Sequence, residues 1–140
     1  MKGKSRQIFI TEFDLQRLED LIEKVRAGSA REAKNLDELE QELEKAEVVP
    51  PKGIPPDVIT MNSRACLTDL DSGEDSVYTL VFPTDADVGS GKISVLAPIG
   101  TAMIGYGIGD KISWKVPGGV KNLLVKEILY QPEAAGDFNL

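Results

Sequence analysis

Histidine is absent from this chain of 140 residues, and cysteine occurs once, at Cys66. Zinc sites in proteins draw most of their ligands from histidine and cysteine, and the serine-type catalytic triads use a histidine as the base. The composition therefore excludes zinc sites and histidine-dependent triads. A single cysteine cannot form an internal disulfide, which fits a reducing compartment, so we expect a cytoplasmic protein.

Long apolar runs and dense basic stretches are also missing. The N-terminus is basic, but no long apolar run follows it, so we expect neither a signal peptide nor a membrane span. Asp and Glu (23) outnumber Lys and Arg (16), giving a net charge of −7. Basic residues drive binding to a phosphate backbone by displacing counterions. We therefore expect no direct nucleic-acid binding and instead a protein partner, with a basic surface as the natural complement.

Two short amphipathic helices are predicted in the first third of the chain. Thr11 has the position of an N-cap, and Gly28 lies where a helix commonly ends. A second helix is predicted to begin at Asn35, after a connector at Ala27–Lys34. The apolar residues of both helices recur at intervals of three, four and three residues: Leu15, Leu18, Ile22 and Val25, then Leu36, Leu39, Leu43 and Ala46. This spacing predicts an antiparallel helical hairpin of the coiled-coil type.

A proline-rich break follows the second helix and separates two predicted domains, 1–49 and 50–140. Beyond it the pattern favours an antiparallel sheet with one short helix near Thr101–Ile104, and a tight corner at Pro98 to Gly100. The fold class is therefore α+β. The predicted strands are Val58–Met61, Ala65–Leu70, Val77–Phe82, Ile93–Ala97, Lys111–Val116 and Val120–Tyr130, the last long enough to bend or bulge.

Several polar or glycine-rich stretches have only a structural interpretation. The acidic run Asp69–Asp75 lacks the spacing of a calcium loop and indicates a solvated turn around Gly73. Three alternating glycines at 105, 107 and 109 lack the context of a phosphate-binding loop. The acids of residues 37–47 indicate a solvated helix face, and Cys66 a core position. Thr60–Arg64 is either a structural turn or a partner surface. No metal site, cofactor site or catalytic group is predicted.

The run GKISVLAPIGTAMIGYGIGDKISWKVPGG resembles the C-terminal domain of the Gre family of transcript-cleavage factors. The family's motifs correspond here to A-P-I-G at 97–100, A-M-I-G at 102–105, I-G-D at 108–110 and P-G-G at 117–119. Two further runs, DVITMNSR at 57–64 and YQPEAAGDF at 130–138, resemble more specifically the Rnk family of Gre-related bacterial proteins, the regulators of nucleoside diphosphate kinase.

The resemblance implies an FKBP-like C-terminal domain and an N-terminal coiled coil. Gre factors dock on the rim of the secondary channel of RNA polymerase and insert a coiled coil, whose two acidic tip residues help to hold a catalytic metal. Rnk-type proteins have a shorter arm without the acidic tip. By correspondence of motifs, Pro98, Ile99 and Gly100 match the polymerase-docking loop, bordered by Met103 and Ile104. No catalytic residue corresponds.

The predicted tip of the hairpin carries a single carboxylate beside two cations; its residues are Gly28, Ser29, Arg31, Glu32 and Lys34. A donated metal site needs paired acids. The sequence therefore predicts a non-enzymatic regulator that binds RNA polymerase, competes with Gre-type factors and cleaves no transcript. Two alternatives stay open. One is a peptidyl-prolyl isomerase, which needs an aromatic-lined pocket near Tyr106 and Trp114. The other is direct regulation of nucleoside diphosphate kinase.

Overall fold

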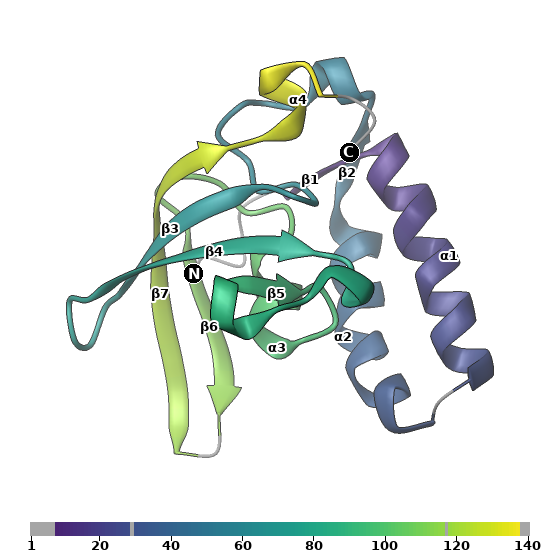
Figure 1. The fold of residues 1–140 in the computed structure, drawn as a ribbon, viewed down its shortest axis with the longest axis horizontal. Helices are drawn as coiled ribbons and strands as arrows, with labels where there is room; N and C mark the ends of the chain where they lie inside the picture. The colour runs from purple at the N-terminus through teal and green to yellow at the C-terminus, as the bar shows by residue number, and fades with distance from the viewer. Residues whose placement is uncertain (1–7, 29, 117, 138–140) are drawn as a thin grey trace.

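The computed structural model describes residues 8–28, 30–116 and 118–137, and the side chains of residues 30–35, 38 and 114–116 lie outside this description. Two helices stand beside a five-stranded sheet (Figure 1). The elements in chain order are β1 (Phe9–Thr11), α1 (Glu12–Gly28), α2 (Ala30–Lys45), β2 (Glu47–Val49), η2 (Pro51–Gly53), β3 (Arg64–Asp69), β4 (Asp75–Val81), η3 (Pro83–Asp85), η4 (Val88–Ser90), β5 (Lys92–Ser94), α3 (Pro98–Met103), β6 (Lys111–Val116), β7 (Gly119–Tyr130) and α4 (Pro132–Ala135).

The helices α1 and α2 lie side by side, with the chain reversing between them (Figure 1). The backbone N–H of Asp14 donates to Oγ1 of Thr11 at 3.0 Å, so the predicted N-cap is confirmed. The predicted start of the second helix at Asn35 is wrong, because α2 already begins at Ala30. The residues in between, AREAK, are strong helix formers, so the helix extends through the expected connector.

The five-stranded sheet has the order β5-β4-β3-β7-β6. Neighbouring strands are antiparallel except β4 and β5, which are parallel. The prediction of an antiparallel sheet is therefore only partly right: η3 and η4 carry the chain back, so that β5 enters in the direction of β4. A separate parallel pair, β1 with β2, is connected by the whole helical hairpin, which supplies the long crossover that parallel strands need.

Residues 58–61 do not form the predicted strand. They make one isolated bridge, between Val58 and Gly107, and Ile59 exchanges backbone hydrogen bonds with Gly105 and Tyr106 instead. The run is apolar because it is a buried loop. The predicted corner at Pro98 is the first turn of α3, since proline at the first helical position starts the helix. Register shifts between β3 and β7 confirm that β7 is bulged.

One hydrophobic cluster joins the hairpin to the sheet. It combines Leu18 and Ile22 of α1 and Leu36 and Leu39 of α2 with side chains of the strands and of α3. The hairpin therefore packs on the remainder of the protein through its apolar stripe. No helix within the described ranges is both long enough and apolar enough to cross a membrane.

Candidate partner-binding site

The first turn of α3 places Pro98 and Ile99 on the surface. Thr101 anchors this turn, because its hydroxyl donates to the backbone oxygen of Val95 at 2.6 Å and its backbone N–H to that of Ala97 at 2.9 Å. Gly100 is buried against β5, and a Cβ at this position would collide with the backbone carbonyl of Ser94. Only glycine therefore allows α3 to approach β5 so closely.

The five residues predicted for polymerase docking divide into two groups. Pro98 is exposed and Ile99 half-buried, so both offer contact surface. Gly100 is buried, and the side chains of Met103 (0% exposed) and Ile104 (2%) belong to the core. These three residues position α3 but cannot contact a partner directly while the fold is intact.

Ile99 also forms one side of a groove on the sheet. Leu67 and Leu123 lie buried in it, and on its rim Nζ of Lys121 pairs with Oδ2 of Asp69 at 2.7 Å. The hydrogen bond from Lys121 lowers the pKa of Asp69, so this carboxylate stays charged. The full lining is Leu67, Asp69, Glu74, Ser76, Tyr78, Ile99, Lys121 and Leu123. An apolar floor with a charged rim suits a segment of a protein partner.

This groove is not the aromatic pocket that the isomerase alternative requires. Tyr78 is the aromatic residue in its lining. Tyr106 lies elsewhere, between α2 and β6, and the side chain of Trp114 is outside the described residues. Nothing in the described part of the chain favours an isomerase.

The buried carboxylate of Asp14 connects α1 to the turn that precedes β3. Oδ2 of Asp14 accepts a hydrogen bond from the backbone N–H of Met61 at 3.0 Å, and Oδ1 accepts from Nη2 of Arg17 at 2.5 Å. Burial raises the pKa of Asp14, while the bonds from Arg17 and Met61 act in the opposite direction. The guanidinium of Arg17 stacks on Phe13 and Phe82, at 4.0 and 4.8 Å from the ring centroids.

The run Thr60–Arg64 forms a turn in which three of the five side chains are buried. Thr60, Met61 and Ser63 are buried, and Asn62 adopts a left-handed backbone conformation with φ of 68°. The Thr60 hydroxyl donates to Oε1 of Glu133 at 2.7 Å, which connects this turn to α4. Burial raises the pKa of the Glu133 carboxyl.

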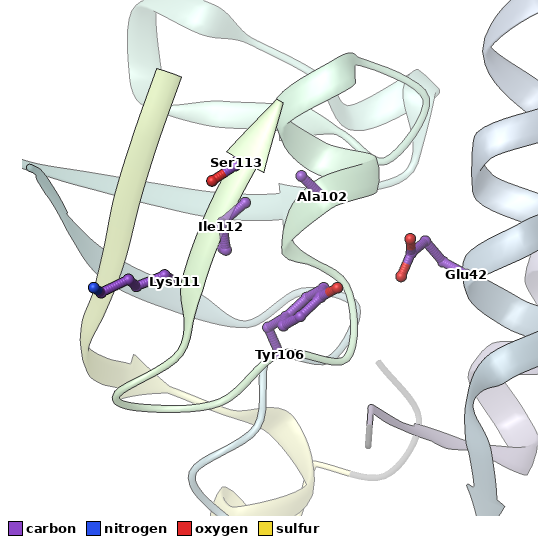
Figure 2. Close-up of a pocket in the computed structure, with 6 residues that line it drawn as sticks. All are labelled: Glu42, Ala102, Tyr106, Lys111, Ile112 and Ser113. Atoms are coloured by element: carbon purple, nitrogen blue, oxygen red, sulfur yellow. The ribbon is translucent and has the colours of Figure 1, made fainter. Parts of the chain in front are cut away.

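A second buried carboxylate, that of Glu42 on α2, faces Tyr106 (Figure 2). Figure 2 shows the hydroxyl of Tyr106 directed toward Glu42 of α2 in a small pocket lined also by Ala102, Lys111, Ile112 and Ser113. Burial, together with the nearby Glu42 and Asp110, raises the pKa of Tyr106 to about 12. Glu42 is only 8% exposed, so the prediction that all acids of residues 37–47 face solvent is wrong at this position.

The predicted tip of the hairpin lies largely outside the described residues. This holds for Ser29 and for the side chains of Arg31, Glu32 and Lys34; Gly28 is the exposed last residue of α1. Further along α2, Asp37 and Glu40 both pair with Arg26 of α1. Within the described part of the chain, no group of three or more Asp, Glu, Cys or His side chains could hold a metal ion.

The sequence did not predict the two buried acids that connect the hairpin to the rest of the protein, Asp14 and Glu42. Asp14 had the position of a capping acid, and its sequence neighbours gave no sign of a bond to Met61. Glu42 did carry a signal, because it follows Leu39 by three residues and adjoins Leu43, at the border of the apolar stripe. A carboxylate at this border can point toward a neighbouring domain as well as into solvent.

Comparisons with known proteins cover nearly the whole chain. A family model for the C-terminal part of the transcription elongation factors GreA/GreB matches residues 54–130, and a model for the Rnk N-terminus matches residues 6–49. A regulator of nucleoside diphosphate kinase from Escherichia coli (strain K12) is 42% identical over 134 residues, which are 95% of this chain and 96% of that protein.

Similarity extends to elongation factors by sequence and by structure. A transcription elongation factor GreA from Chelativorans sp. (strain BNC1) is 35% identical over 116 residues, 79% of this chain and 74% of the relative. The structure of a prokaryotic transcription elongation factor GreA/GreB from Nitrosomonas europaea matches with a TM-score of 0.72 and 42% identity, over 89% of this chain and 99% of that one. The mixed helix and sheet fold is thus that of the GreA/GreB proteins.

Proposed function

This chain belongs to the GreA/GreB family of transcription elongation factors and, within it, to the Rnk group, and we propose that it is a regulator that docks on RNA polymerase at the rim of the secondary channel. There it competes with Gre-type factors and promotes no transcript cleavage of its own. It acts in the cytoplasm, through protein contacts rather than direct binding to nucleic acid, in keeping with its net charge of −7.

The observation that carries the docking proposal is the surface of α3. Pro98 and Ile99 lie in the motif that the Gre resemblance connects with polymerase docking; Pro98 is exposed, and Ile99 lines a groove with an apolar floor. Apolar residues at the centre of a contact and charges at its rim are the usual composition of a protein interface. The Asp69–Lys121 ion pair would lie on that rim.

The absence of cleavage rests on the sequence of the tip. A metal shared with a host enzyme needs paired carboxylates at the end of the arm. Between Gly28 and Asn35 the sequence has one acid, Glu32, between the cations Arg31 and Lys34. Of the acids further along α2, Asp37 and Glu40 share an ion pair with Arg26 of α1.

The arm is also short and fixed in direction. The helix α1 has 17 residues, which corresponds to about 25 Å at the rise of an α-helix. Asp14 bonds to Met61 and Glu42 faces Tyr106, so each helix of the hairpin has a polar link to the sheet side. An arm held in this way would occupy the channel entrance in one orientation, which is what a blocking factor requires.

A competition pull-down on core RNA polymerase tests this proposal. Excess protein should displace a Gre-type factor, and Pro98→Glu should weaken displacement, because it adds a charge to the apolar contact while an acid remains favourable at a helix start. Val48→Glu is the matched control, since Val48 is 44% exposed and belongs to β2 rather than to the docking motif of α3. Retention of the Gre-type factor in large excess of this protein would refute the proposal.

A further inference from the structure

The helical hairpin has a groove of its own, separate from the groove beside Ile99. It runs between α1 and α2 and has a volume of about 200 Å³. Its apolar residues are Leu15 and Ile22 of α1 and Leu43 of α2, and its polar residues are all acidic: Glu19, Glu40 and Glu44. Leu15 and Leu43 are only half-buried, so the apolar stripe of the hairpin is incompletely covered.

The spacing of the apolar residues matches that of a helix. Leu15 and Ile22 are seven residues apart, which places them two turns or about 10.5 Å apart along α1. A third helix lying along the groove would present apolar side chains at the same interval. Loops and extended strands have no such repeat, so the groove favours a helical ligand.

The charges around the groove indicate which residues should lie on either side of the apolar stripe of that ligand. Glu19 and Glu44 are exposed on opposite helices, and no basic side chain of the described residues pairs with either. Glu40 is also acidic but is paired with Arg26. An occupant with Lys or Arg on both sides of its apolar stripe would meet a carboxylate on each side.

We propose that this groove binds an amphipathic helix of a partner protein, with apolar residues at i, i+3 or i+4, and i+7 and basic residues on both flanks. The apolar residues insert between Leu15 and Leu43, and the basic residues pair with Glu19 and Glu44. The complex is then a short three-helix bundle. This surface belongs to the hairpin and is independent of the α3 surface proposed for polymerase docking.

Fluorescence anisotropy with the full chain tests the proposal. The probe is a labelled 15-residue peptide of Leu and Lys, with Leu at the heptad a and d positions. A peptide of the same composition in scrambled order, which has the charge but no apolar stripe, is the first control. The ordered peptide should bind more tightly than the scrambled one, and equal binding of the two would overturn the proposal.

Matched charge variants locate the binding surface. The double variant Glu19→Gln/Glu44→Gln should weaken binding of the ordered peptide about fivefold, because two exposed ion pairs are lost. The double variant Asp71→Asn/Glu127→Gln removes the same charge from the β3–β4 turn and from β7, which lie across the molecule from the hairpin (Figure 1), and should change binding less than about twofold. An equal loss in both double variants, or no binding by the ordered peptide, would refute the assignment.

Discussion

Asp14 and Met61 are 47 residues apart in sequence, yet the Asp14 carboxylate accepts a hydrogen bond from the Met61 backbone N–H at 3.0 Å. Asp14 is 0% exposed and Met61 1%. This bond joins the base of the hairpin to the turn that precedes β3. Because a buried N–H without a partner is costly, the Asp14 side chain adds a specific polar contact to the apolar packing that orients α1.

Replacement of Asp14 by Ala should destabilise the protein by about 2 to 3 kcal/mol, because it leaves the Met61 N–H unpaired and Arg17 without its carboxylate. Urea denaturation measures the loss. Asp20→Ala is the control on the same helix, where an exposed acid should change stability by less than about 0.5 kcal/mol. Equal effects of the two substitutions would contradict this role of Asp14.

The stability of the protein should also depend on Glu133 in weakly acidic solution. Burial raises the folded-state pKa of Glu133 above its ordinary value of 4.5, so the folded chain binds this proton at a higher pH than the unfolded chain does. Wild type should therefore gain stability relative to Glu133→Gln as the pH falls from the raised pKa toward 4.5. Glutamine can still accept the bond from Thr60 but does not titrate. A difference in unfolding free energy that is constant with pH would contradict this prediction.

Tyr106 should make the stability of the protein depend on pH in alkaline solution. Its pKa is about 12 in the folded protein, against an ordinary value of 10.0, so it favours folding below pH 10 and loses that contribution as the pH rises toward 12. The stability advantage of wild type over Tyr106→Phe should therefore shrink between these pH values. Urea midpoints of both proteins along this range measure it. A gap that stays constant would mean that burial and the nearby acids do not raise the pKa of Tyr106 in the folded protein.

Gly100 should tolerate no side chain. In Gly100→Ala the new methyl group would meet the Ser94 backbone, so α3 must shift away from β5 at a cost of about 1 to 3 kcal/mol. Gly28→Ala is the control, because a Cβ at Gly28 has no neighbour within 4 Å. Thermal unfolding should show a lower midpoint for the first variant and an unchanged or higher one for the second. Matching midpoints for Gly100→Ala and wild type would contradict the close packing of α3.

The sequence predicted what periodicity and turn chemistry control locally. The Thr11 cap, the end of α1 at Gly28 and the turn around Gly73 follow from side chains acting on their own neighbours. The prediction failed where long-range partners decide. The run 58–61 has a strand-like pattern, but its backbone bonds to Gly105 and Tyr106 instead of to a ladder.

In the candidate site, too, the sequence predicted the local motif but not the contacts made by long-range packing. The Pro98-Ile99-Gly100 motif was visible in the sequence, and the packing of α3 explains why only its first turn is exposed. The burial of Asp14 could not be predicted, because Asp14 looks like an ordinary acid in the first turn of a solvated helix, and Glu42 had only its place at the border of the apolar stripe as a signal. Their burial depends on Met61 and Tyr106, which tertiary packing brings to them.

The measurement that tests the central claim most directly uses a stalled, backtracked elongation complex of RNA polymerase. Added alone, the protein should produce no shortening of the RNA, and added with a Gre-type cleavage factor it should reduce the shortening that this factor causes. Pro98→Glu should restore shortening, whereas Val48→Glu should not. RNA shortening by this protein alone, or undiminished cleavage in its presence, would contradict the claim that it is a polymerase-docking regulator without cleavage activity.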